Sequence, residues 1–167
     1  MALLDVELNA RTTVGVTTQY PGNTFEQSLT GGAELKLGLP DSPFYVSLGG
    51  ELGVMNYSQD DFDSQFMIGR AEMSLMWKKS ENFHFGILAA TTHRLGSTGF
   101  KNEPPMTLFA GAGFETSSES FLFRANAGYV HMRKLENPML LPDGQKFSSD
   151  FNAGAFGLHI TVGIPIL

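Results

Sequence analysis

The sequence contains no cysteine. A disulfide framework, a cysteine-based zinc site and a thiol nucleophile are therefore all excluded. Charged side chains are also scarce, at 17% of the 167 residues, and the 11 Lys and Arg residues form no basic run. Because a nucleic-acid surface needs clustered positive charge and the formal net charge here is -6, we expect no nucleic-acid partner.

Long apolar runs are missing as well. No stretch approaches the roughly 18 to 20 apolar residues of a membrane-spanning helix. The start, Met1-Ala2-Leu3-Leu4-Asp5, lacks the basic and apolar regions of a secretory signal peptide, so we expect any export signal to have been removed. The length of 167 residues predicts a single domain over residues 1–167.

The chain is instead rich in glycine, with 19 residues, and in a pattern that repeats every second position. Between residues 4 and 20 the even positions are mostly apolar and the odd positions mostly polar. Side chains of a β-strand alternate between two faces, so this pattern predicts a strand with one polar face. Similar stretches recur at 4–20, 25–39, 44–54, 67–78, 83–94, 106–116, 121–129 and 155–166.

The connections between these stretches alternate in length. They are uniformly about four residues after the second, fourth and sixth stretches, and reach about a dozen elsewhere, as at 135–146. An even number of strands with short turns at one end and longer loops at the other is typical of an up-and-down barrel. We therefore predict an all-β fold, an eight-stranded antiparallel up-and-down transmembrane β-barrel.

Two observations favour a membrane location over a soluble barrel. Most stretches have about 11 residues or more, which matches the roughly 9 to 11 residues of a tilted membrane-crossing strand. Aromatic residues gather near the strand ends, as expected for belts at two membrane interfaces. The predicted interfacial aromatics are Tyr20, Phe44, Tyr57, Trp77, Phe83, Phe121, Phe123 and Tyr129.

The polar face carries charges of both signs, which we expect inside the barrel. The predicted internal charge network is Glu7, Arg11, Glu34, Lys36, Glu51, Arg70, Glu72, Arg124 and His159. Antiparallel registers could place Arg11 across from Glu34, Arg70 across from Glu51, and Arg124 near His159. Enclosed charges need such partners, so the pattern indicates a plugged interior, with a conduction path or proton relay as the alternative.

The abundant glycines fit a small barrel, because large inward side chains need neighbours that yield space. In this respect and in topology the chain resembles, over nearly its whole length, the eight-stranded bacterial outer-membrane barrels, such as the transmembrane domain of OmpA, OmpX and the opacity-type surface proteins. The closing residues 159–167, His-Ile-Thr-Val-Gly-Ile-Pro-Ile-Leu, look like the C-terminal assembly signal of that class. Leu167 replaces the usual terminal aromatic, and Pro165 is unusual so near the end.

The resemblance implies a monomer in the outer membrane of a Gram-negative-type bacterium. Its surroundings would be outer-membrane lipid and lipopolysaccharide, and the barrel assembly machinery would insert it. A surface ligand would bind the loops at 56–64, 96–105 and 135–146, since loops on a rigid scaffold carry recognition. The role implied is that of an envelope anchor or surface-interaction protein.

Residues for catalysis or metal binding are few. The four histidines form no metal-binding spacing, and we expect no metal, no cofactor and no catalytic residue. Outer-membrane lipid A deacylases place a His-x-Ser element on the wall, but the segments His131-Met132-Arg133 and His159-Ile160-Thr161 lack the serine. A non-enzyme is therefore favoured. A soluble lipid-binding barrel, a narrow channel and a lipid-modifying enzyme are the alternatives.

Overall fold

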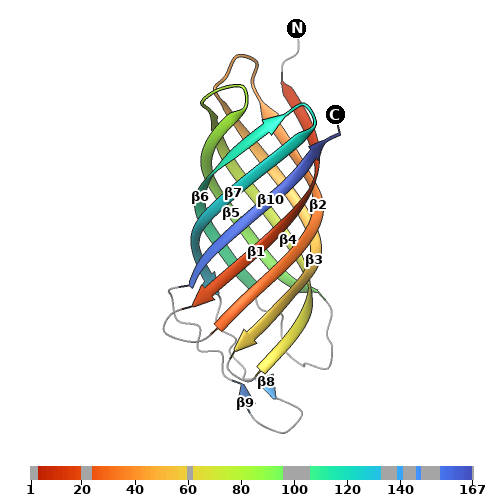
Figure 1. The fold of residues 1–167 in the computed structure, drawn as a ribbon, viewed down its shortest axis with the longest axis vertical. Helices are drawn as coiled ribbons and strands as arrows, with labels where there is room; N and C mark the ends of the chain where they lie inside the picture. Colours follow the sequence, from red (N-terminus) through yellow and green to blue (C-terminus); the bar gives the residue numbers. More distant parts are fainter. Residues whose placement is uncertain are drawn as a thin grey trace.

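The computed structural model describes residues 4–19, 24–59, 62–95, 106–132, 139–140, 146–147 and 155–166. Within these ranges eight antiparallel strands close into a barrel, and this confirms the predicted all-β barrel fold (Figure 1). Each strand pairs with its neighbours along the chain, and the last strand closes on the first. The strands are β1 (Asp5–Gln19), β2 (Thr24–Gly38), β3 (Phe44–Gln59), β4 (Phe62–Lys78), β5 (Phe83–Leu95), β6 (Met106–Ser118), β7 (Phe121–Met132) and β10 (Ala155–Pro165).

Short turns join the strands at one end of the barrel, here called the turn end. They occupy residues 39–43, 79–82 and 119–120, and the start of β1 and the end of β10 lie at the same end (Figure 1). In the first turn Asp41 adopts a left-handed backbone with φ of 64°, which an aspartate tolerates better than most residues. The opposite end, which carries the longer connections, is called the loop end.

The predicted loops differ from the structure in their extent. The loop expected at 56–64 is largely strand: β3 continues to Gln59, β4 begins at Phe62, and the Gln65 amide donates to the Asn56 side-chain oxygen at 2.9 Å. Polar side chains do not prevent backbone pairing, so the ladder extends beyond the alternating pattern. Within 135–146, Met139–Leu140 (β8) pairs with Lys146–Phe147 (β9). Residues 96–105 lie outside the described residues.

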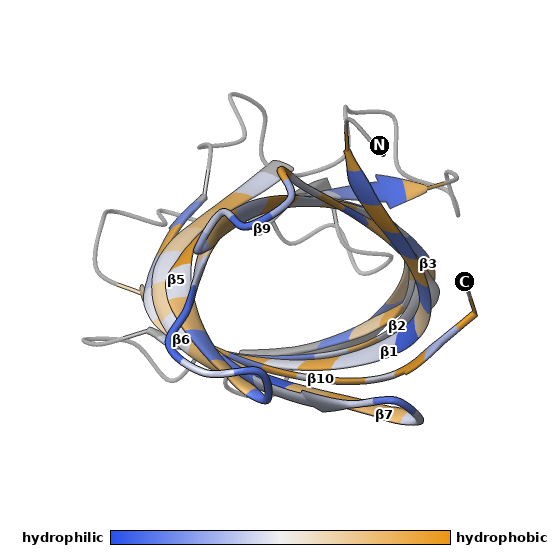
Figure 2. Cartoon of the chain, turned by 90° about the horizontal axis from the view of Figure 1, so that it is seen from above, coloured by the Kyte–Doolittle hydropathy of each residue, from blue (hydrophilic) through white to orange (hydrophobic). Residues whose placement is uncertain are grey.

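The outer wall of the barrel is apolar and its interior is polar. Leu52, Met67 and Ile87 are 66%, 64% and 61% exposed, whereas Arg124 and Glu34 are 0% exposed. Figure 2 shows blue and orange residues alternating along the strands, as expected for side chains that point alternately inward and outward. In the described part of the chain, no helix is long and apolar enough to cross a membrane.

Two inward-facing glycines leave room for large neighbours, as the sequence predicted for small residues in a narrow barrel. A side chain at Gly49 on β3 would overlap the guanidinium of Arg11. A side chain at Gly157 on β10 would lie 2.7 Å from a Val130 methyl group and 3.2 Å from the ring of Phe109. Both glycines therefore set the space available to a specific interior side chain.

Candidate functional site

A network of buried charges occupies the middle of the barrel and extends toward the turn end. We call it the charged layer, and its members are nearly fully buried and form ion pairs with one another. They are Arg11, Glu34, Lys36, Glu51, Arg70, Glu72, Glu115 and Arg124. The layer contains as many cations as anions. Buried charges of both signs can persist only when they are paired in this way.

Arg124 on β7 is the central member of the charged layer. Its Nη2 lies 2.7 Å from Oε1 of Glu34, its Nη1 lies 3.0 Å from Oε1 of Glu72, and its Nε donates to Oε2 of Glu115 at 2.9 Å. Glu115 is on the neighbouring strand β6, but Glu34 and Glu72 are on β2 and β4, which do not pair with β7. One side chain thus connects strands on different sides of the interior.

Arg11 and Arg70 share the carboxylates of Glu51 and Glu72. Arg11 Nε lies 2.6 Å from Glu51 Oε1 and its Nη1 lies 2.8 Å from Glu72 Oε1, while Arg70 Nη2 lies 2.6 Å from Glu72 Oε2. The β3–β4 register places Arg70 directly opposite Glu51. Arg11 reaches Glu34 at 3.4 Å, but diagonally, because the β1–β2 register places Asn9 opposite Glu34.

Hydroxyl groups donate further hydrogen bonds to the carboxylate of Glu51. Thr13 donates to Oε1 at 2.8 Å, and Thr30 donates to Oε2. Thr13 also lies 2.9 Å from the hydroxyl of Thr161 on β10, so the hydrogen bonds continue across the seam between the first and last strands. Hydrogen bonds to a charged acceptor are stronger than those between neutral groups, so these threonines help to fix the carboxylate in place.

Toward the turn end, the charged layer ends at Lys36 and Glu115. Lys36 Nζ lies 2.9 Å from Glu115 Oε1 and 3.0 Å from Glu7 Oε1, and the Glu7 side chain is 43% exposed at the mouth of the barrel. The Tyr45 hydroxyl donates to Glu115 Oε1 at 2.9 Å, and Nδ1 of His84 lies 2.9 Å from that hydroxyl. Glu115 therefore joins the buried network to the groups at the mouth.

Sequence reasoning omitted Glu115, Tyr45 and His84 from the network. A signal for Glu115 was present, because the two-residue turn at 119–120 fixes the hairpin register and places Glu115 directly opposite Arg124. No comparable local signal identifies Tyr45, since its contact to Glu115 crosses between strands that do not pair. His84 is directly opposite Glu115 in the β5–β6 register, but no short turn between these strands fixes that register from the sequence.

Toward the loop end, the interior contains a cluster of apolar side chains beside buried polar residues such as Glu26 and Arg94. We call this cluster the apolar layer, and its members are Leu88, Ala90, Phe109, Val130 and Ala155. The ring of Phe109 packs against His159, with ring centroids 4.1 Å apart. His159 Nδ1 also lies 3.0 Å from Arg70 Nη2, so this histidine lies between the two layers.

Arg124 and His159 are not directly opposite each other but two positions apart in the β10–β7 register. The β10–β7 register places Thr161 opposite Arg124, and the guanidinium turns toward the three carboxylates that neutralise it. His159 contacts Arg70 and Phe109 instead. The alternation of inward and outward side chains assigned both residues to the interior. It carried no information about how far along the barrel axis each residue lies.

The predicted interfacial aromatics fall on the outer face where their side chains are described. Phe44, Trp77, Phe83 and Phe121 lie on strand segments beside the turns, and Trp77 contacts Phe44 and Phe85 with centroid distances of 6.4 and 4.6 Å. Phe123 is half-buried against Phe114, at 6.1 Å. Tyr129 is 44% exposed toward the loop end. The side chains of Tyr20 and Tyr57 lie outside the described residues.

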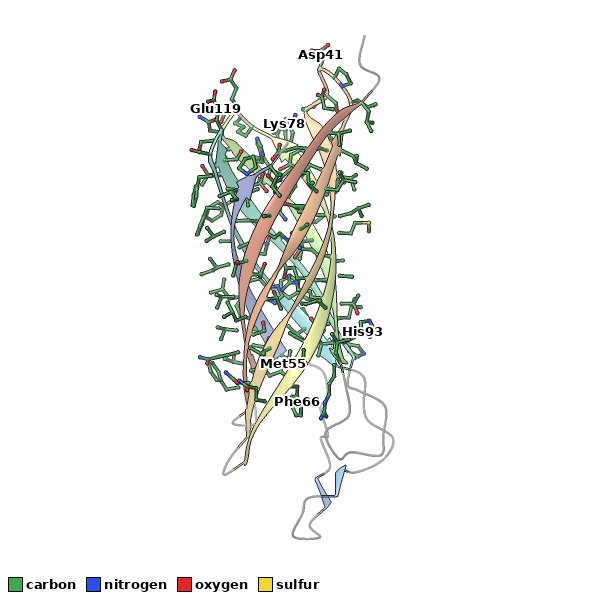
Figure 3. All side chains as sticks on the ribbon, turned by 90° about the vertical axis from the view of Figure 1, so that its right-hand side faces the viewer. Asp41, Met55, Phe66, Lys78, His93 and Glu119 are labelled. Atoms are coloured by element: carbon green, nitrogen blue, oxygen red, sulfur yellow. The ribbon has the colours of Figure 1, made fainter. Side chains whose placement is uncertain are left out.

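Among the described residues, the interior side chains form ion pairs and pack against one another. Over the described ranges, no group of three or more His, Asp or Glu residues could hold a metal ion. His93 and His131 are exposed on the wall, and the His93 ring lies 3.0 Å from the Thr91 hydroxyl. Figure 3 places Asp41, Lys78 and Glu119 at the turn end and Met55, Phe66 and His93 toward the loop end.

No family model matches the chain, and no curated protein matches it. Among solved structures, it is similar to a barrel from the de novo design of transmembrane β-barrels, with 16% identity, a TM-score of 0.52 and coverage of 96% of this chain and 95% of that chain. The translocator domain of the autotransporter NalP from Neisseria meningitidis also matches, with 11% identity, a TM-score of 0.33 and coverage of 98% and 88%. The chain shares with the designed barrel its overall fold.

Proposed function

We propose that this chain is an integral barrel of a bacterial outer membrane that serves as a non-enzymatic anchor or surface-interaction protein. The observation that carries the proposal is the reversal of polarity between wall and interior. Large apolar side chains point outward from all eight barrel strands, whereas paired charges fill the interior. A closed barrel also pairs its strand backbone internally, which the hydrocarbon of a bilayer requires.

The arrangement of the two ends supports an orientation. Outer-membrane barrels have short turns on the periplasmic side and longer loops outside the cell. The turn end would then face the periplasm and the loop end would face the surroundings, where the connections at 96–105 and 135–146 would meet any ligand. The aromatic side chains near the turns, including Trp77 and Phe44, would lie at the periplasmic interface.

The charged layer supports a closed interior. Arg124 reaches carboxylates on three strands, and an apolar cluster packs in the interior toward the loop end. The soluble lipid-binding alternative needs an apolar interior and a solvated Arg11, but Arg11 is only 4% exposed. We therefore favour a plugged anchor over a lipid carrier or a channel.

The first experiment dilutes denatured protein into detergent micelles and into plain buffer. A membrane barrel should show strand circular dichroism in micelles, together with a gel mobility that changes on boiling, and should aggregate in buffer. A monodisperse folded protein in buffer without detergent would overturn the proposal. In planar bilayers the folded protein should show no conductance steps, and regular steps would refute the plugged interior while leaving the membrane location intact.

A charge placed on the wall tests the membrane contact directly. Leu52→Arg introduces a guanidinium in the middle of β3, where the wall is most exposed, and should cost about 2 to 4 kcal/mol of unfolding free energy in lipid vesicles. Leu39→Arg in the turn, where Leu39 is 60% exposed, is the matched control and should cost about 1 kcal/mol or less. Equal losses at the two positions would contradict a membrane-embedded wall.

A further inference from the structure

A small cavity lies in the interior between the charged layer and the loop end. Arg70 of the charged layer lines it, and so does Met55, which Figure 3 shows in the loop-end half of the barrel. The cavity has a volume of about 20 Å³, which is room for about one or two guests of the size of water but not for an organic ligand. Several of its lining side chains carry oxygen, namely Thr17, Glu26, Ser28, Thr92 and Thr107.

Glu26 on β2 supplies a carboxylate to this cavity. The residue is 6% exposed, and among the described residues it forms neither an ion pair nor a hydrogen bond. Both carboxylate oxygens nevertheless keep accessible surface, and because the residue lines the cavity, they face that space. Buried polar groups in folded proteins nearly always have a partner, so this carboxylate calls for a guest that binds it.

Two hydroxyl groups lie beside this carboxylate. Thr17 is directly opposite Glu26 in the β1–β2 register, and Ser28 follows Glu26 by two positions, so its side chain is on the same inward face. Neither hydroxyl forms a hydrogen bond within the described part of the chain. Gly15 is opposite Ser28 and makes room for its hydroxyl, because a side chain at Gly15 would overlap Ser28 Oγ. Three oxygen-bearing side chains on two paired strands therefore line one side of the cavity.

The positive groups near the cavity are already engaged with other partners. Arg70 Nη2 lies 2.6 Å from Glu72 Oε2 and 3.0 Å from Nδ1 of His159, which also lines the cavity. An arginine can only donate, so Nδ1 of His159 accepts and the ring is not a second cation. Arg94, another buried cation toward the loop end, lies over an aromatic ring at 3.9 Å and does not line the cavity. None of these groups neutralises the unpaired carboxylate.

We propose that the cavity binds one small monovalent cation, such as sodium, through the carboxylate of Glu26 and the hydroxyls of Thr17 and Ser28. Hard cations bind oxygen ligands, and a single carboxylate balances a single positive charge. Calcium takes about six to eight oxygens and usually several carboxylates. Over the described ranges, no group of three or more acidic or histidine side chains could hold such an ion. This ion site goes beyond the proposed membrane anchor and does not depend on it.

The test is a sodium titration of protein folded in micelles, labelled with ¹³C at the glutamate carboxyl groups and observed by NMR at about pH 8, where protons compete little. Sodium chloride replaces the chloride of N-methylglucamine, a cation too large for the cavity, at constant ionic strength. We expect the Glu26 resonance, assigned from Glu26→Gln, to shift with saturation and a midpoint at or below the roughly 0.15 M of physiological salt. The resonance of Glu119, exposed at the turn end, should show no saturable shift.

Matched variants locate the ligands of the cation. Thr17→Val should weaken sodium binding about 3- to 10-fold, because a methyl group replaces one oxygen ligand at nearly the same volume. Thr18→Val is the control, since Thr18 is the next residue and is exposed on the outer wall, and its midpoint should equal that of the unaltered protein. Glu26→Gln should abolish the dependence of urea unfolding on sodium. The boiling-dependent gel shift verifies that each variant is folded.

Four outcomes would overturn the proposal: no saturable shift of Glu26 with sodium, tighter binding of calcium than of sodium, equal weakening by Thr17→Val and Thr18→Val, or a Glu26 carboxyl that responds to pH alone. The last outcome would mean that the carboxylate holds a proton instead of a metal cation. If the protein folds in plain buffer, the same titration is made there. Failure of the membrane proposal and failure of the cation site are thereby separated.

Discussion

The charged layer and the apolar layer fill the same barrel by different physical means. In the charged layer, Arg124 alone contacts three carboxylates on three strands. In the apolar layer, Phe109 packs against neighbouring side chains without a directional bond. Loss of one charged member therefore leaves several partners unpaired, whereas loss of one apolar member leaves a void. Members of the charged layer should therefore depend on one another for stability more than members of the apolar layer do, although both sets are buried.

The largest effect should come from Arg124→Met. Three buried carboxylates lose their shared cation, and breaking a buried ion pair costs about 3 to 5 kcal/mol. The measurement is urea unfolding in lipid vesicles. Adding Glu115→Gln to this variant should restore about 1 kcal/mol or more, because the second change removes one of the unpaired charges. A cost for Arg124→Met below about 1 kcal/mol would show that the layer is hydrated, and the contrast with the apolar layer would vanish.

Phe109→Ala should rank next, with a cost of about 3 kcal/mol from lost packing and the cavity that remains. Equilibrium unfolding in vesicles measures the cost. The adjacent Leu108 points outward, with 47% exposure, and Leu108→Ala is the control. Lipid can fill the space outside the wall, so the control should lose clearly less. If the two variants lose the same free energy, Phe109 is not part of a packed interior.

The barrel and the direction of its side chains follow from the sequence because both depend on a local period of two. Residues such as Arg11 and Glu72 could be assigned to the interior on this basis alone. Which charges meet is different: the contact between Arg124 and Glu34 joins strands that are not paired, and depends on strand tilt and stagger. No local pattern encodes that geometry, so the apolar layer was also missed.

The two glycines that make room inside the layers offer a finer test. Gly49→Ala should cost about 2 kcal/mol, since the new methyl group displaces the Arg11 guanidinium from its carboxylates. Gly157→Ala should cost about 1 kcal/mol, since it meets side-chain atoms of Phe109 and Val130 that can shift. Gly50 faces outward, and a methyl group added there would meet no atom within 4 Å, so Gly50→Ala should change the free energy of unfolding by less than about 0.5 kcal/mol. A larger loss of stability for Gly157→Ala than for Gly49→Ala would contradict the view that the ion pairs are rigid and the apolar packing can adapt.

An effect as small as that of Gly157→Ala is expected from Thr13→Val, at about 1 kcal/mol, because it removes hydrogen bonds to Glu51 and Thr161 while keeping the volume. Thr12 is the adjacent outward residue, and Thr12→Val should be neutral or slightly stabilising in vesicles. The measurement is the free energy of chemical unfolding of the Thr13→Val and Thr12→Val variants, determined in parallel. Equal losses would mean that the Thr13 hydroxyl adds nothing to the charged layer.

The seam between β1 and β10 has a consequence for the order of folding. Thr13 and Thr161 are 148 residues apart in the chain, and Arg124 and Glu34 are 90 apart. Contacts between such distant residues form late, because the intervening chain must first be ordered. Until the last strand docks, the arginines and glutamates keep their water. In a membrane, the protein would therefore enter the hydrocarbon and close its ring in one concerted step, with no stable half-inserted form.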